Sequence, residues 1–394
     1  MDETRRPVRL AVVQCFLPEY RVPVFRRLAA LPSLEMTLYF GAAAGRRYKK
    51  YRSVPNAEGI PHRRLRTIPL FVALGGRVFS QFFHPALVFH LIAARPDVVL
   101  LEGESNLANN LLTVPLCLLM RIPYVWWGLG RFRREPESVF RRLFRPVVRF
   151  MLSRAAAVIG YSEFARAYYV SQGARGDRTF VARNTIDTDL AFESASKYAP
   201  LVEGERRRLG LEGKKVMLFV GAIERTKRLE NALLAFESLK AKHPELGFLI
   251  VGDGEDRPRL ETLAAERGIR DVVFAGAKFE DVSLYFLTGD VFVLPGLGGL
   301  HIPHAMCHSL PVVASFADGT EEELITNGEN GFIVERNDVG QLAEAIGKIV
   351  ADPALAAAMG RRSRRIIEEK FNVHNMIGAI EKAVLFAGET GRKR

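Results

Sequence analysis

The segment "VMLFVGAIERTKRLENALLAFESLKAKHPELGFLIVGDG", residues 216–254, decides the fold of this chain. It begins with a continuous apolar run, 216–223, continues through an amphipathic stretch, 228–243, and ends in a second apolar run, 246–254. Strands of a parallel sheet are covered on both faces, so they read as continuous apolar runs rather than as alternating ones. The segment therefore predicts a strand, a covering helix and a second parallel strand.

The same alternation of apolar runs and amphipathic stretches occurs in both halves of the chain. Further strand-like runs are "VRLAVVQC", "PDVVLLEG", "IPYVWWGLG" and "AAAVIGYS" in the first half, and "DVFVLPG" and "LPVVAS" in the second. Strand character is lost between 190 and 210. The pattern predicts an α/β protein with two doubly wound domains, residues 1–195 and 196–370, facing each other across a cleft. A C-terminal helix, 371–394, is expected to pack back across the domain junction.

Composition places the chain among globular proteins, with 48% hydrophobic and 25% charged residues. Three scattered cysteines, Cys15, Cys117 and Cys307, do not suggest a disulfide framework and favour a reducing compartment. The N-terminus "MDETRRPVRLAVV" lacks the apolar core of a secretion signal, and no window reaches the length of a membrane span. We therefore expect a cytoplasmic protein.

Positive charge is concentrated in the first half. Residues 1–190 hold 29 Lys and Arg against 14 Asp and Glu, whereas the remainder holds 27 against 30. A half-chain this basic indicates an anionic partner, such as nucleic acid, acidic lipid or a phosphorylated acceptor. No nucleic-acid-binding module is recognisable, so we do not expect a nucleic acid partner.

Six segments of the second half follow one another in a specific order. They are "LFVGAIERTKRLENALLAF", "FLIVGDGEDRPRLETLA", "VVFAGA", "GDVFVLPG", "HAMCHSLPVVAS" and "EEELITNGENGFIV". Their order and spacing, over residues 216–350, resemble the nucleotide-sugar-binding domain of the retaining GT-B glycosyltransferases of family 4. The first half fits more loosely. The resemblance implies two Rossmann-like domains, sugar transfer with retention, and neither a metal ion nor a protein nucleophile.

The resemblance also implies a donor site. Lys227 matches the family's lysine, which neutralises the leaving diphosphate. The family's arginine directly follows the glycine that ends the first strand, here Gly221, but Ala222 stands at that position. Arg225 is the preferred substitute and Arg228 the second choice, and both can equally be solvated first-turn charges. The amides of three residues are expected to hold the phosphates at a helix start. These residues are Gly298, Gly299 and Leu300.

Two family glutamates are missing. Alignment on "AM" and "LPVV" places Gly296 where the family has its first glutamate and His304 where it has its second. In the family, the first glutamate lies near the transferred sugar and the second bonds the ribose of the donor. Imidazole can still bond a ribose hydroxyl, and the glycine is expected to leave room for a bulkier sugar. Glu323 matches a further family glutamate, whereas Glu321 and Glu322 are read as a solvated charge run.

Three histidines within eight residues raise the question of a metal. His304 and His308 have an i, i+4 ligand spacing, but the stretch offers no nearby acidic ligand. We expect no metal site here, and His308 is interpreted as a helix-face residue.

The acceptor is expected to bind the N-terminal domain at strand ends. The candidates are Glu19 and Arg21 after the first strand, Glu102 and Glu104 after "VVLL", and Gly128 in "WWGLG". Glu19 and Glu102 are the two candidates for orienting an acceptor hydroxyl. A structural carboxylate at a strand end is the alternative for each acid.

A basic helix is predicted over 138–154, "SVFRRLFRPVVRFMLSR". Arg141, Arg145 and Arg149 share one stripe. An apolar stripe holds Phe140, Leu143, Phe144, Val147 and Met151. Basic amphipathic helices bind anionic membranes, although a core-packed helix with a solvated arginine face is the alternative. The basic stretch 45–53 and the Phe-rich stretch 68–90 favour the membrane, so we expect a protein peripheral to the inner face of the plasma membrane.

The sequence thus predicts a hexosyltransferase-type enzyme that moves a sugar, with retention, from a nucleotide sugar to a lipid-linked or cell-surface glycan acceptor. No cofactor besides the nucleotide-sugar co-substrate is expected. The alternative is a GT-B protein that has lost transfer and binds a nucleotide sugar or a glycan. A nucleotide-sugar epimerase is disfavoured because the basic half suggests a large anionic partner.

Overall fold

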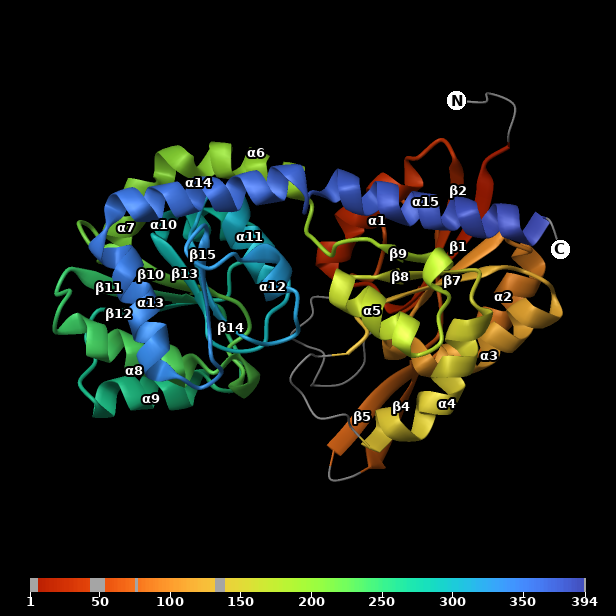
Figure 1. The fold of residues 1–394 in the computed structure, drawn as a ribbon, viewed down its shortest axis with the longest axis horizontal. Coiled ribbons are helices and arrows are strands. Elements are labelled where there is room, and N and C mark those ends of the chain that lie inside the picture. The colour runs from red at the N-terminus through yellow and green to blue at the C-terminus, as the bar shows by residue number, and fades with distance from the viewer. Residues whose placement is uncertain (1–5, 43–53, 75–76, 132–138, 393–394) are drawn as a thin grey trace. The chain divides into compact units, whose positions relative to one another are not determined.

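The computed structural model describes residues 6–42, 54–74, 77–131 and 139–392. These residues divide into two compact units (Figure 1). Unit 1 contains the described residues up to 184 together with 374–392, and unit 2 contains 185–373. The break after residue 184 comes earlier than the predicted domain end at 195, and the C-terminal helix belongs to unit 1.

Unit 1 is built on a parallel sheet with the strand order β3-β2-β1-β6-β7-β8-β9. The strands are β1 (Val8–Phe16), β2 (Leu34–Gly41), β3 (His62–Arg64), β6 (Val98–Glu102), β7 (Tyr124–Gly128), β8 (Ala157–Gly160) and β9 (Thr179–Val181). The central strands β6 and β7 are buried almost throughout, which explains their continuous apolar sequences. The predicted parallel sheet is confirmed.

Helices cover both faces of the unit 1 sheet. The helices are α1 (Val22–Ala29), α2 (Leu87–Ala94), α3 (Leu107–Leu119), α4 (Val139–Arg154), α5 (Glu163–Ser171) and α15 (Val373–Arg392). Helices α2 to α5 bury their apolar residues in one core cluster with β1, β6 and β7. Helix α15 lies on the other side, where Gly388 packs against Val8 and Val98 at the starts of β1 and β6. Phe386 of α15 also meets Phe180 of β9.

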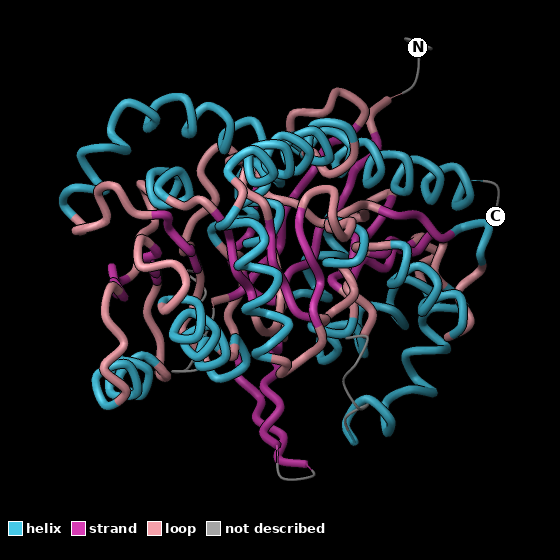
Figure 2. Tube along the Cα trace, turned by 60° about the vertical axis from the view of Figure 1, so that its left-hand side comes forward, coloured by secondary structure: helices cyan, strands magenta, loops and turns pink. Residues whose placement is uncertain are grey.

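An antiparallel hairpin, β4 (Ile68–Leu74) and β5 (Arg77–Phe83), projects from unit 1 (Figure 2). Its base is fixed by Asn109 of α3, whose amide group donates to the carbonyl of Phe82 and whose carbonyl oxygen accepts from the amide of His84. Ile68, Leu70 and Phe71 of β4 are exposed.

Unit 2 is built on a second parallel sheet, with the order β12-β11-β10-β13-β14-β15. The strands are β10 (Lys215–Val220), β11 (Leu246–Val251), β12 (Val272–Gly276), β13 (Val291–Leu294), β14 (Val312–Ser315) and β15 (Gly331–Val334). The chain runs outward from β10 to β12 and then returns beside β10 at β13. The carboxyl ends of β10 and β13 therefore flank the point where the strand order reverses, which is where open α/β sheets bind ligands.

The helices of unit 2 lie on both sides of this sheet (Figure 1). On one side are α8 (Leu229–Lys240), α9 (Arg257–Glu266) and α13 (Val339–Ala351), with α8 packed on α13. On the other are α6 (Thr188–Tyr198), α7 (Val202–Arg208), α10 (Val282–Thr288), α11 (His301–Cys307) and α14 (Pro353–Glu369). The short helix α12 (Glu321–Leu324) follows β14.

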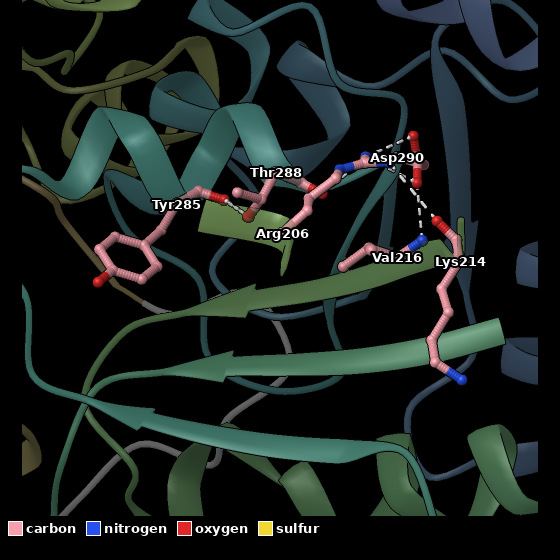
Figure 3. Close-up of polar contacts among 6 residues, drawn as sticks. All are labelled: Arg206, Lys214, Val216, Tyr285, Thr288 and Asp290. Atoms are coloured by element: carbon pink, nitrogen blue, oxygen red, sulfur yellow. Dashed lines mark hydrogen bonds and ion pairs between the residues drawn. The ribbon is translucent and has the colours of Figure 1, made fainter. Parts of the chain in front are cut away.

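A polar cluster joins α7 to the start of the sheet in unit 2 (Figure 3). Nη2 of Arg206 donates to both carboxylate oxygens of Asp290, at 3.0 and 3.1 Å, and to the carbonyl of Thr288 at 2.8 Å. The same carboxylate accepts from the amide of Val216 at 2.7 Å. One arginine thus holds α7, the start of β10 and the turn before β13 together, at the edge of the sheet opposite the carboxyl ends of its strands.

Candidate functional site

Two strand-end loops of unit 2 approach each other closely. A Cβ on Gly252 would lie 1.9 Å from the carbonyl oxygen of Gly221, and one on Gly254 would lie 2.2 Å from that of Ile223. Such an approach requires glycine. The amide of Ile223 also donates to the carbonyl of Asp253 at 3.0 Å. The loop after Gly221 is therefore held in place at the carboxyl edge of the sheet.

Lys227 lies at the end of the 3₁₀ turn η6 (Arg225–Lys227) and is buried. Its Nζ donates to the carbonyl oxygens of Leu297 at 2.6 Å and Gly298 at 2.8 Å. The amide of Leu297 donates in return to the carbonyl of Thr226 at 3.0 Å. The structure therefore brings the predicted lysine and the predicted phosphate turn together, joined by three hydrogen bonds.

Gly296 lies where this turn meets η6. A Cβ at this position would lie 2.4 Å from the carbonyl oxygen of Thr226 and 2.5 Å from the carbonyl carbon of Lys227. The expectation that this glycine leaves room for a larger sugar is wrong, because protein backbone fills the space. The glycine serves the close contact between two loops, and a glutamate side chain would not fit here without moving them.

Gly298, Gly299 and Leu300 form the turn that leads into α11. Gly299 has a φ of +119°, a conformation that glycine adopts far more readily than other residues. The turn lies beside a carboxylate, because Oδ2 of Asp318 is 3.4 Å from the position that a Cβ of Gly298 would take. Asp318 is buried and is oriented by the amide of Thr320, which donates to its Oδ1 at 2.9 Å.

His301, the first residue of α11, was given no role by the sequence, but the structure brings it into the site. A Cβ on Gly221 would lie 3.2 Å from its Nε2, so the ring lies against the end of β10. Burial, together with the positive charge of Lys227, lowers the pKa of His301 to about 3. Its Nδ1 is buried and has no hydrogen-bond partner within the described residues. His301 is therefore a neutral imidazole with an unused polar atom.

His304 and His308 pack against one aromatic ring. The ring centroid of Phe286 in α10 lies 4.4 Å from that of His304 and 5.2 Å from that of His308. Nδ1 of His308 donates to the carbonyl of His304 at 2.8 Å. Burial lowers the pKa of His304 well below its usual value and that of His308 to about 4. Both rings are therefore neutral at physiological pH, and His308 is a buried residue.

Among the three consecutive glutamates, Glu321 is the buried one, with 1% of its surface exposed. Its carboxylate accepts from the amides of Ala317 at 2.7 Å and Gly319 at 3.0 Å. The reading of Glu321 as a solvated charge is therefore wrong: it supports the loop that carries Asp318. Burial raises its pKa. Glu322 and Glu323 are half-buried in the same short helix.

Arg225 lies two residues before Lys227 but differs from it in environment. Its side chain is 78% exposed, and its Nε is 3.8 Å from the carboxylate of Asp256. Arg259 binds the same carboxylate with two hydrogen bonds, at 2.7 and 3.0 Å. Arg225 is therefore a surface cation on the loop that carries Lys227, and the structure shows no contact between it and the phosphate turn.

In unit 1, Glu102 ends β6 and both of its carboxylate oxygens take part in local bonds. Oε2 accepts from the amide of Cys15 at 2.9 Å, and Oε1 accepts from the hydroxyl of Ser105 at 2.9 Å. These bonds fix the carboxylate between the ends of β1 and β6. They show the structural role that the sequence left open as an alternative.

Gly128 ends β7 and leaves space for two polar side chains. A Cβ there would lie 2.5 Å from the hydroxyl of Tyr169 and 3.2 Å from Oε2 of Glu104. The hydroxyl of Tyr169 donates to Glu104 at 3.0 Å and accepts from the amide of Gly130 at 2.9 Å. Burial raises the pKa of Glu104. Gly128 therefore belongs to a polar network within unit 1.

Glu19 and Arg21 lie on the 3₁₀ turn η1 (Glu19–Arg21) after β1, but only the arginine is buried. Glu19 is exposed. The guanidinium of Arg21 contacts the rings of Tyr20, Trp127 and Tyr161. Tyr20 precedes Arg21 on the same turn, but Trp127 of β7 and Tyr161 after β8 are distant in the sequence, so the sequence offered no direct signal for this group.

Helix α4 runs unbroken through Pro146. The burial of its side chains differs from the predicted apolar and basic stripes. Phe140, Phe144 and Val147 pack on the core, but Leu143 is 63% exposed, and Phe150 is also exposed. Arg141 is not fully solvated, because it donates to the carbonyl of Gly130 at 2.9 Å. Arg142, Arg149 and Arg154 are the exposed arginines of this helix. The basic stretch 45–53 lies outside the described residues.

Clustered metal ligands and membrane-spanning helices are both absent from the described residues. Within that part of the chain, no group of three or more His, Cys, Asp or Glu side chains has the geometry to hold a metal ion. Likewise, no described helix combines the length and apolar character that crossing a bilayer requires.

Both halves of the chain match glycosyltransferase families. Residues 202–366 match the family described as glycosyl transferases group 1, and residues 27–190 match glycosyltransferase family 4. Each unit therefore contains a segment that is similar to a glycosyltransferase domain. The group 1 match contains Lys227 and the 296–300 turn, and the family 4 match contains Glu102 and Gly128, whereas Glu19 and Arg21 precede the matched segment.

The curated relatives of this chain have low sequence identity to it. The α-D-kanosaminyltransferase of Streptomyces kanamyceticus is 28% identical over 249 residues, which cover 61% of this chain and 64% of that protein. The GDP-mannose-dependent α-(1-6)-phosphatidylinositol monomannoside mannosyltransferase of Mycolicibacterium smegmatis is 29% identical over 192 residues, which cover 45% and 49%. The chain thus spans about half to two thirds of the length of these relatives.

Solved structures extend the likeness to almost the whole chain. HepE of Anabaena, solved with UDP, has a TM-score of 0.74 and 19% identity, and the match covers 96% of this chain and 99% of that one. WaaG, described as a glycosyltransferase of lipopolysaccharide biosynthesis, has a TM-score of 0.65 and 17% identity, covering 95% and 99%. This likeness confirms the predicted GT-B fold class with its two Rossmann-like domains.

Proposed function

We propose that this chain transfers a hexosyl group from a nucleotide sugar to an acceptor, with retention of configuration and without a metal ion. The observation that carries the proposal is the buried ammonium of Lys227 against the Leu297–Gly298 turn, inside the segment that matches the group 1 family. HepE was solved with UDP and with UDP-glucose, which supports a nucleotide-sugar donor.

In this proposal the donor diphosphate meets Lys227 and the glycine-rich turn. Breakage of the glycosidic bond leaves negative charge on the diphosphate, and a cation already held at that point stabilises it without having to reorganise. The carbonyls of Leu297 and Gly298 hold the ammonium in place before the donor arrives. Arg225 is a solvated cation on the same loop and strengthens the attraction for the anionic donor.

The two missing glutamates are replaced by other polar groups of the site. His304 takes the ribose, because a neutral imidazole has one donor and one acceptor nitrogen. Asp318, beside Gly298, supplies a carboxylate near the transferred sugar, where Gly296 offers none. His301 offers its unpartnered Nδ1 between Gly221 and Gly299. Glu323 is assigned to the donor because it matches the family position.

On the acceptor side, we assign a lipid-linked or cell-surface glycan to unit 1. Glu102 and Gly128 lie at the carboxyl ends of β6 and β7, where acceptors are expected. The name of the mycobacterial relative specifies a phosphatidylinositol monomannoside, a lipid acceptor of that protein, which supports this class.

We also propose that the protein is cytoplasmic and binds the inner face of the plasma membrane through α4. This helix exposes Leu143 and Phe150 together with Arg142 and Arg149. Apolar side chains flanked by arginines fit the interface of an anionic bilayer, where each basic residue near the surface adds about 1 kcal/mol.

The second candidate function is a protein that binds a nucleotide sugar without transferring it. The observation that favours it is the loss of both motif glutamates, at Gly296 and His304. Incubation with UDP-, GDP- and ADP-sugars, with and without membrane extract, separates the two functions. We expect release of nucleoside diphosphate that depends on the extract. Binding without turnover for every donor would establish the second function instead.

A further inference from the structure

Arg21 is a buried cation in an aromatic surrounding. It is 4% exposed, and its guanidinium carbon lies 4.7 Å from the ring centroid of Trp127, 5.3 Å from that of Tyr161 and 5.6 Å from that of Tyr20. Trp127 lies near the end of β7, and Tyr161 directly follows β8. The flat guanidinium is thus held by ring faces, an arrangement that suits arginine and not lysine.

The hydrogen bonds of this arginine are incomplete. Nη2 donates to the hydroxyl of Tyr161 at 3.0 Å, whereas Nη1 is buried without a hydrogen-bond partner among the described residues. Within the same residues, no carboxylate pairs with the guanidinium. Taking a cation out of water without a counterion is costly, and so is leaving one of its donors unused. The group is therefore ready to accept an anion.

The neighbours of Arg21 do not supply that anion. Burial raises the pKa of Tyr161, so its phenol stays neutral at physiological pH. Glu102 attracts the arginine from a distance, but its two oxygens accept from the amide of Cys15 and the hydroxyl of Ser105 rather than from the guanidinium. The positive charge of Arg21 consequently remains without a direct partner.

The position of Arg21 in the fold also points to a ligand. It lies just beyond the end of β1, at the carboxyl edge of the unit 1 sheet where β7 and β8 also end. The ring of Tyr20, which is 41% exposed, covers the guanidinium on the solvent side. An oxyanion that binds the guanidinium therefore meets this ring.

We propose that Arg21, with Tyr20, Trp127 and Tyr161, forms a subsite for an oxyanion carried by the acceptor, a phosphate or a carboxylate. Both groups present two oxygens to the arginine fork, and Nη1 is the donor that the protein leaves for them. The assignment of this anion to the acceptor rests on the proposed sugar transfer, whereas binding of the anion itself does not. The subsite selects acidic acceptors, such as a phosphate-linked lipid or an acidic glycan, over neutral ones.

The chain supplies its own probe for this subsite. Its two tryptophans are Trp126 and Trp127, and only the ring of Trp127 contacts Arg21. In a Trp126→Phe background, fluorescence reports Trp127 alone. We expect a saturable change on titration with inorganic phosphate or with acetate, and none with chloride at equal ionic strength. A response to phosphate and not acetate, or the reverse, identifies which oxyanion the subsite takes.

Variants of two arginines test the assignment. Arg21→Gln should abolish the change, Arg21→Lys should weaken it at least about tenfold because the fork is lost, and Arg26→Gln, an exposed position on the next helix, should leave it unchanged. The absence of any saturable response in the parent protein, or an equal response in Arg21→Gln, overturns the subsite. If Arg21→Gln does not fold, the parent titration and Arg21→Lys still decide.

The titration contains no donor sugar, so a failure of the subsite can be distinguished from a failure of the proposed function. Anion binding with no turnover of any nucleotide sugar would reject the transferase while the subsite stands. Transfer to neutral and acidic acceptors at equal rates, together with a flat titration, would reject the subsite while the transferase stands.

Discussion

The ammonium group of Lys227 lies 2.6 Å from the carbonyl oxygen of Leu297, so one buried cation fixes the turn that precedes α11. The carbonyl of Gly298 accepts a second bond from it. The side chain that we assign to the donor diphosphate is therefore also the one that shapes the diphosphate turn. We therefore expect binding of the donor and the conformation of this turn to be coupled through Lys227.

Replacing Gly296 with alanine tests the close contact between the turn and η6. The added Cβ would lie 2.4 Å from the carbonyl oxygen of Thr226, and backbone has to move to relieve it. We expect the free energy of unfolding to fall by about 1–3 kcal/mol, as for other overpacked sites, measured by urea unfolding. Gly204→Ala is the matched control, because nothing lies within 4 Å of a Cβ there. Equal stability of the two variants would contradict the contact.

His301→Ala tests whether this imidazole meets the donor. Loss of one hydrogen bond should weaken binding of a nucleoside diphosphate by about three- to tenfold, measured by calorimetry, and His301→Gln should restore part of it. Because the pKa of His301 is lowered to about 3, its protonation should not affect binding between pH 5 and 8. Unchanged affinity in His301→Ala would remove this residue from the donor site.

The stability of unit 2 should depend on pH through His308. Its pKa is about 4 in the folded protein, below the usual value of about 6.5, so the unfolded chain takes up the proton first as the pH falls. The free energy of unfolding should therefore decrease between pH 6.5 and 4, by up to about 3 kcal/mol from this residue.

His308→Asn keeps a donor for the carbonyl of His304 and removes the titration. Urea unfolding followed by circular dichroism should show a shallower pH dependence for this variant. His301 and His304 contribute with the same sign, so part of the dependence should remain. An unchanged slope would show that the ring of His308 is hydrated in solution.

Reversing the charge of two exposed arginines of α4 tests whether this helix binds an anionic membrane. Arg142→Glu with Arg149→Glu should reduce co-sedimentation with anionic vesicles at least about tenfold, because each basic residue near the surface contributes about 1 kcal/mol. Arg361→Glu with Arg365→Glu, an exposed pair on α14, provides the same change of charge in unit 2. Equal loss in both double variants would indicate a general charge effect, and no loss in either would indicate that α4 only packs on the core.

The fold was predictable because buried parallel strands leave a local signature. The strands β6, β7, β10 and β11 are continuously apolar apart from Glu102 at the end of β6 and Lys215 at the start of β10, and the amphipathic stretch of α8 lies between β10 and β11. Lys227 was likewise predictable, since it lies in one of the segments whose order resembles the family, and so was the turn at Gly298, since it lies between two of them.

The features of the site that the sequence did not predict depend on contacts between distant segments. The need for glycine at 296 comes from the backbone of Thr226, and the role of His301 comes from Gly221 at the end of another strand. Among three consecutive glutamates, the sequence does not show which one turns inward, and Glu321 does so because α12 begins there. The surrounding of Arg21 is likewise assembled from β7 and the residue after β8.

The rate of sugar transfer by Lys227→Ala at saturating donor tests the central claim most directly. Lys242→Ala, an exposed lysine of unit 2, serves as the control. We predict a fall of about two orders of magnitude in kcat for Lys227→Ala, the usual effect of losing one electrostatic stabiliser, and no change for the control. A near-normal kcat in a folded Lys227→Ala variant would contradict the assignment of this lysine to the leaving diphosphate.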